Sequence, residues 1–151
     1  MDTALWQEIS AALAGGSASD GSGDALGQLT DLWNRCPPEE AALRCVVAHY
    51  AADLEPDLAG ETAWDERALA AWAQSDATDW EDIGIAQPLA MLPSLHLNLG
   101  DDYERAGATG EARRHLAKAR EHVSQLADDG YGRMIRAGID GLAQRCDVDT
   151  V

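Results

Sequence analysis

Histidines are the first side chains in this sequence that suggest chemistry, because three of them could meet at one metal ion. His115 and His122 lie seven residues apart and share a face of a helix predicted over 110–127, and His96 lies on the helix before it. Three imidazoles are enough to hold zinc. However, His96 falls at a position that packs between helices, and no nearby acid or cysteine has ligand spacing. We therefore expect packing or surface histidines, with no metal and no cofactor.

Acidic residues concentrated in one stretch are the second candidate for chemistry. They could bind a cation or a basic partner, but the spacing of Asp79, Glu81 and Asp82 lacks the glycine and final glutamate of a calcium loop. A solvated, self-repelling face is the favoured interpretation. The stretch comprises Asp53, Glu55, Asp57, Glu61, Asp65, Glu66, Asp76, Asp79, Glu81 and Asp82.

Enzyme motifs are missing from the sequence. It contains no glycine-rich phosphate loop, no G-x-S-x-G elbow, no H-E-x-x-H and no paired cysteines. The three cysteines, Cys36, Cys45 and Cys146, are an odd number at spacings that match no zinc site, so we expect small buried hydrophobes. The first ten residues lack the basic segment followed by an apolar segment that is typical of a signal peptide. A non-enzymatic, cytoplasmic protein with reduced thiols is therefore expected.

Charge is distributed unevenly along the 151 residues, whose net charge is −16. Residues 1–104 hold 20 acidic and three basic residues, whereas residues 105–151 hold seven and eight. Nucleic acids and membrane surfaces are bound through Lys and Arg, so neither is an expected partner. Any anion recognition is expected in the last third.

Helical periodicity dominates the chain, in which alanine supplies much of the apolar content and phenylalanine is absent. Alanine has the highest helix propensity and allows helices to approach closely. The sequence predicts an all-α protein of about seven helices in a single domain over 1–151. A flexible loop is expected over 15–24 and an acidic connection over 75–88. The last five helices are expected over about 38–54, 57–74, 89–106, 110–127 and 131–146.

The stretch SLHLNLGDDYERAG, residues 94–107, is ambiguous by itself. Its leucines alternate as in a strand, but they also fit a helix with Gly100 as a packing notch. The following segment favours the helix, since Gly100 can face Ala112 or Ala119 across a helical hairpin. The packing positions of the two helices are His96, Leu99, Gly100, Tyr103, Ala112, Leu116 and Ala119.

This spacing resembles the tetratricopeptide repeat (TPR) over residues 93–126, with His96 where the family prefers Trp and Ser124 where it often has Pro. A degenerate copy around 40–74 carries Leu43, Val46, Val47 and Tyr50, followed by Ala59 and Ala63. The resemblance implies a short right-handed α-solenoid of antiparallel helical hairpins. The helix over 131–146 would then cap its last apolar face.

The resemblance also implies a function, because TPR proteins capture extended peptides on a concave surface, often by their carboxylates. We therefore expect a protein- or peptide-interaction module, with a C-terminal carboxylate as one ligand of the groove. An all-α small-molecule or metal-responsive sensor is the alternative. The chain could also form a homodimer, because short solenoids expose an apolar end and five tryptophans lie in the first 80 residues. The groove residues are Ser94, Leu97, Asn98, Asp101, Arg105, Arg133 and Arg136.

Overall fold

The computed structural model describes residues 3–15 and 22–148, and the secondary structure of that part of the chain is entirely helical. This confirms the prediction of an all-α protein. The chain divides into two compact units, Met1–Ala86 and Gln87–Val151. Within the described residues, no helix has the length and apolar character needed to cross a membrane. Residues 16–21 of the loop predicted over 15–24 lie outside the described residues.

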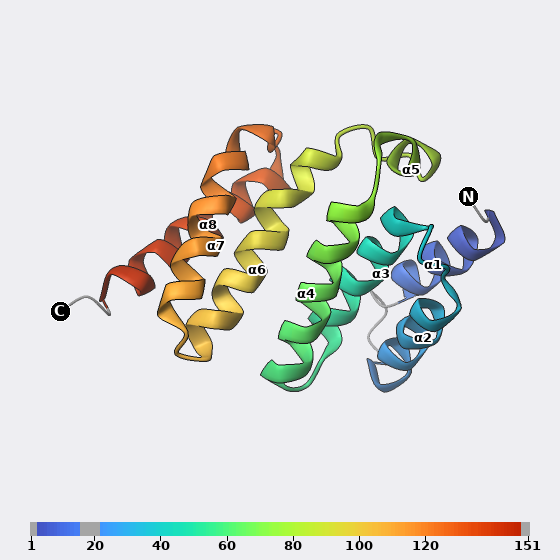
Figure 1. Ribbon diagram of the computed structural model, residues 1–151, viewed down its shortest axis with the longest axis horizontal. Coiled ribbons are helices and arrows are strands. Elements are labelled where there is room, and N and C mark those ends of the chain that lie inside the picture. The colour runs from blue at the N-terminus through green and yellow to red at the C-terminus, as the bar shows by residue number, and fades with distance from the viewer. Residues whose placement is uncertain (1–2, 16–21, 149–151) are drawn as a thin grey trace. The chain divides into compact units, whose positions relative to one another are not determined.

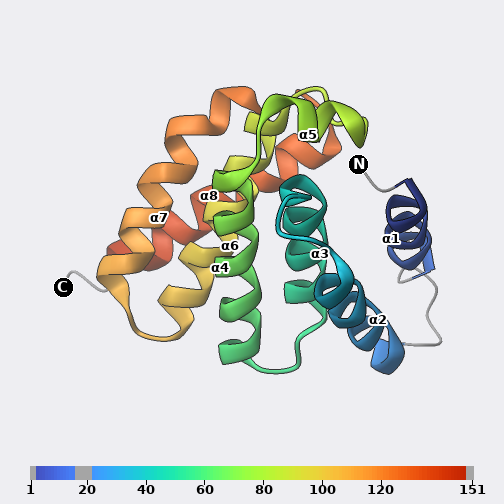
Figure 2. The same cartoon turned by 45° about the vertical axis from the view of Figure 1, so that its right-hand side comes forward.

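The first unit is organised around one buried helix. In Figures 1 and 2, α3 lies between α2 and α4, and α3 packs against both. Because small side chains fill the contacts of α3, its two neighbours can approach closely; Cys45, Val47 and Ala48 are fully buried. The helices of this unit are α1 (Thr3–Gly15), α2 (Ser22–Arg35), α3 (Ala41–Leu54), α4 (Leu58–Gln74) and α5 (Ala77–Asp82).

The pair α3 and α4 forms an antiparallel helical hairpin in the segment where the degenerate copy of the repeat is expected (Figure 1). Pro56 lies in the turn, where it cannot continue the preceding helix. The Asp57 side chain caps α4 by accepting a hydrogen bond of 2.9 Å from the Gly60 backbone N–H. Pro56 and Asp57 therefore define the turn between the two helices of the hairpin.

Helix α5 lies within the acidic connection predicted over 75–88, where no helix was expected. Asp76 accepts hydrogen bonds from the backbone N–H groups of Thr78 and Asp79, and the Asp79 side chain accepts one from the Asp76 N–H. This reciprocal capping box starts a helix of one and a half turns. Trp80 anchors it, since its side chain is buried and its indole N–H donates to Ser75 Oγ at 2.7 Å.

The second unit contains a second antiparallel hairpin, α6 and α7, and α8 packs against both of its helices (Figure 1). The helix predicted to reach residue 127 ends earlier, at His122, and a 3-10 turn follows. The elements are η1 (Pro88–Met91), α6 (Leu92–Arg105), α7 (Thr109–His122), η2 (Val123–Gln125) and α8 (Gly130–Val148).

The Gly100 notch is occupied differently from the prediction. A Cβ placed on Gly100 would lie 2.6 Å from Leu142 Cδ2 of α8, and 3.5 Å or more from Ala112 O and His115 Cβ. The notch therefore receives chiefly a leucine of α8, and the backbone of α7 is its second neighbour. Ala112 and Ala119 are fully buried, as the repeat spacing predicts for the small residues of the second helix.

The five tryptophans are at least half-buried. Trp64 and Trp80 have exposed fractions of 5% and 2%, and Trp6, Trp33 and Trp72 are half-buried. In the described part of the chain they therefore serve the packing of the first unit.

Candidate functional site

Helix α6 carries five of the seven groove residues that the sequence predicts. Pro93 occupies its opening turn, where a missing backbone N–H costs nothing, and Gly107 follows its end with φ +77°. The helix presents Ser94, Leu97, Asn98, Asp101 and Arg105. The other two residues, Arg133 and Arg136, lie on α8.

The first two of these side chains contact their own unit. The Ser94 hydroxyl is buried and donates a hydrogen bond of 2.9 Å to Met91 O. Leu97 is half-buried, and its Cδ2 occupies the space where a side chain of Gly138 would stand, 2.7 Å from the Cβ position. Both residues therefore hold α6 in place. Asn98, one turn after Ser94, is half-buried.

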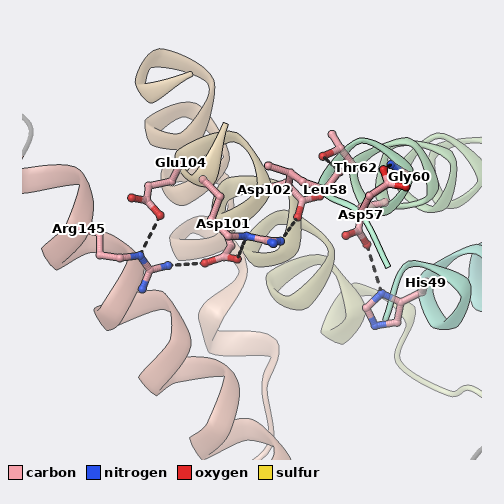
Figure 3. A network of polar contacts seen from close by, with 11 residues as sticks. His49, Asp57, Leu58, Gly60, Thr62, Asp101, Asp102, Glu104 and Arg145 are labelled. Carbon is pink, nitrogen blue, oxygen red and sulfur yellow. Dashed lines mark hydrogen bonds and ion pairs between the residues drawn. The ribbon is translucent and has the colours of Figure 1, made fainter. Parts of the chain in front are cut away.

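Asp101 and Arg105 belong to an ion-pair network that the sequence did not reveal. Arg145 of α8 binds Asp101 and Glu104, the latter through Nε at 3.0 Å, and Figure 3 shows this fork between the two helices. Arg105 binds Asp101 at 2.9 Å and Asp102 at 2.8 Å. The Arg105 guanidinium is thus oriented by two carboxylates, with which a ligand carboxylate must compete.

The arginines of α8 fall into two separate places. Arg136 donates hydrogen bonds to Leu126 O at 2.7 Å and Ala127 O at 3.1 Å, and Arg133 lies 3.4 Å from Asp128. Nine residues separate Arg136 from Arg145, which is about 14 Å along a helix. Arg133 and Arg136 therefore lie at the other end of α8 from the network that holds Arg105. The structure does not bring all seven predicted residues to one point.

Two of the histidines meet between α6 and α7. His96 Nδ1 lies 2.9 Å from His115 Nδ1, and the Tyr103 ring stacks on the His115 ring with 5.5 Å between centroids. Burial, and then the charges of His115, His122 and Lys118, lower the pKa of His96 to about 4. At neutral pH the Nδ1–H of one imidazole therefore donates a hydrogen bond to the Nδ1 of the other. His96 has the packing position that the sequence predicts.

A pocket in the first unit was not predicted. It lies where the end of α2, the start of α3 and the second half of α4 meet, and its volume is about 180 Å³. Two of the three basic residues that precede residue 105, Arg44 and Arg67, line it. The scarcity of basic residues in this part of the sequence is the signal that could have pointed to them. The complete lining is Trp33, Pro38, Ala41, Arg44, Arg67, Ala70, Ala71 and Gln74.

Comparison with protein-family models, with curated proteins and with solved structures finds no match to this chain.

Proposed function

We propose that this protein is a non-enzymatic interaction module, a short right-handed solenoid of TPR-like hairpins that docks a protein or peptide segment. The observation that carries the proposal is the α6–α7 hairpin. Its second helix has fully buried Ala112 and Ala119, its first helix has the Gly100 notch, and α8 packs on both. These are the positions on which the resemblance to TPR proteins was based.

The polar surface of α6 is the proposed docking site, with Asn98 and Arg105 as its ligand-binding residues. Arg105 is exposed on the last turn of α6, and its fixed guanidinium can bind a carboxylate through two N–H groups. The side-chain amide of Asn98, two helical turns earlier on the same face, adds directed hydrogen bonds. A peptide with a free C-terminus is the proposed partner.

The three cysteines support placing the protein in a reducing compartment, the cytoplasm. All of them are buried, and none forms a disulfide within the described part of the chain. A secreted protein of this kind would more often join its cysteines in disulfides.

The docking proposal is tested with a displayed library of peptides that have free C-termini. Selected peptides should bind more weakly as salt is raised, and Asn98→Ala and Arg105→Ala should each reduce affinity by roughly tenfold, the loss expected for a charged or directed hydrogen bond. Arg114→Ala is the matched control, because Arg114 is an exposed arginine of α7 that pairs with the neighbouring Glu111. Unchanged binding in both α6 variants would reject this surface. Light scattering of the same samples tests self-association.

A metal-responsive sensor is the second candidate function, favoured by the close approach of His96 and His115. Two imidazole nitrogens 2.9 Å apart already have nearly the separation of adjacent ligands on one metal ion. Zn²⁺ or Cu²⁺ would then raise the melting temperature by mass action. If neither ion shifts the melting temperature, the metal version of this candidate is excluded.

A further inference from the structure

Two arginines and two tryptophans of the first unit are connected by ring contacts, and three of them, Trp33, Arg44 and Arg67, line its pocket. The Arg44 guanidinium carbon lies 3.7 Å from the centroid of the Trp33 ring, and that of Arg67 lies 4.5 Å from the Trp64 ring. The two indoles meet edge to face, with 5.5 Å between centroids. Cation–π contacts therefore hold both guanidiniums. Such a contact uses the ring face and not the N–H donors, of which Arg44 commits its Nη1 group to backbone carbonyls.

Neither guanidinium is neutralised by a carboxylate within residues 3–15 and 22–148. Arg44 donates to Cys36 O at 2.6 Å and reaches Trp33 O at 3.5 Å, both of them backbone carbonyls. Arg35, the third basic residue of the unit, pairs with both Glu8 and Asp31. In a chain with 27 acidic residues, two unpaired guanidiniums beside one pocket are a local excess of positive charge.

The size and lining of the pocket limit what it can hold. Its volume of about 180 Å³ is below the roughly 300–1,000 Å³ of pockets for drug-sized ligands. It corresponds to about six waters at roughly 30 Å³ each, which suits a group of the size of one side chain. The walls are apolar at Pro38, Ala41 and Ala71, and polar at the two arginines and Gln74.

We propose that this pocket binds a carboxylate carried on a small apolar body. A planar carboxylate matches the fork of N–H donors that a guanidinium presents, and the alanine walls accept the few carbons behind it. A monoanion is favoured over a dianion such as phosphate, because the net charge of −16 repels the second negative charge. The ligand is either a free short-chain acid or the C-terminal residue of a peptide. The site involves none of the α6 residues proposed above.

The test is a titration of the ¹⁵N-labelled full chain followed by NMR. The probes are propionate, N-acetylalanine, the amides of both, and inorganic phosphate. Both carboxylates should shift the indole N–H signal of Trp33 and the side-chain amide of Gln74, whereas the amides should not. If N-acetylalanine binds roughly tenfold more tightly than propionate, the natural ligand is a chain terminus. Equal affinities indicate a free organic acid.

Variants connect the signal to the two guanidiniums. Arg67→Gln should weaken carboxylate binding roughly tenfold. Arg67 is exposed and makes no hydrogen bond to the other described residues, so the fold should survive its loss. Arg44→Gln should do the same, with the dispersion of the spectrum reporting whether the fold is kept. Arg35→Gln is the matched control and should bind as the unmodified chain does.

Three results would overturn the proposal. The first is the absence of any shift with either carboxylate at tens of millimolar. The second is equal shifts from the carboxylates and their amides, which would indicate apolar binding alone. The third is unspecific attraction of anions, which would show either as unchanged affinity in Arg67→Gln or as phosphate binding as tightly as the carboxylates.

Discussion

His96 and His115 share one hydrogen bond between α6 and α7, with 2.9 Å between their Nδ1 atoms. The bond needs one ring to donate and the other to accept. If both rings are protonated, two N–H groups point at each other and the bond is lost. The α6–α7 hairpin therefore contains a contact that depends on pH.

Acidification should destabilise the protein through His96. Its pKa of about 4 in the folded chain lies below the usual 6.5, so the unfolded chain binds more protons between these values. The contribution of His96 to stability is therefore fully present above pH 6.5. It decreases as the pH falls through this window and decreases no further below about pH 4. Since His96 is only half-buried, we expect a loss of about 1 kcal/mol, or roughly 2–4 °C in melting temperature.

Thermal melts of variants isolate this effect from the many carboxylates. His96→Gln should flatten the decrease between pH 6.5 and 4 relative to the unmodified chain. His49→Gln replaces a half-buried histidine of α3 that is not among the groups acting on His96, so it is the control and should retain the decrease. Parallel pH curves for all three proteins would show that His96 does not carry the dependence.

Two glycines of the second unit should respond in opposite ways to alanine. In Gly100→Ala, the new Cβ would lie 2.6 Å from Leu142 Cδ2, and Leu142 is fully buried and cannot move aside. Overpacking costs about 1–3 kcal/mol and exceeds the gain of up to about 1 kcal/mol in helix propensity. In Gly138→Ala the neighbour is Leu97, which is half-buried and can swing away.

Urea denaturation measures the difference. We expect Gly100→Ala to lose about 1 kcal/mol of unfolding free energy, and Gly138→Ala to lie between no change and a gain of about 1 kcal/mol. Equal effects of the two substitutions would contradict the assignment of Gly100 as the contact notch.

The sequence predicts the helices well where local signals are strong. Prolines and caps mark the ends of α3, α4 and α6, and the alanine and glycine spacing predicts the α6–α7 contact. These features depend on residues close in sequence, so periodicity and capping rules suffice to find them.

The features that sequence reasoning missed depend on distant residues. Arg145 meets Asp101 and Glu104 more than 40 positions away in the chain. The Arg44 and Arg67 pocket likewise depends on how α2, α3 and α4 pack. The scarcity of basic residues draws attention to such arginines, but only the packing shows which acids neutralise them. Helix α5 was missed for another reason, because its six residues are too few to show periodicity.

Removing the cap of α5 should unfold that helix locally. Asp76→Ala deletes both hydrogen bonds that the side chain accepts from the start of α5, at a cost of about 1 kcal/mol. A helix of six residues has almost no stability of its own, so hydrogen exchange of its amides should accelerate roughly tenfold. Glu81→Ala, an exposed acid of the same helix, is the control that should leave exchange unchanged.

The cysteines should be unreactive in the native protein. Cys36, Cys45 and Cys146 have exposed fractions of 2%, 0% and 1%, and burial raises the pKa of the Cys45 thiol to about 12. The thiolate is the nucleophile, so a buried thiol with a raised pKa reacts with a disulfide reagent only after the chain opens. Titration with such a reagent at pH 8 should find almost no thiol in the native protein and three in urea. Rapid reaction of one thiol without denaturant would show that its helix opens locally, and mass spectrometry of the labelled peptide would identify which one.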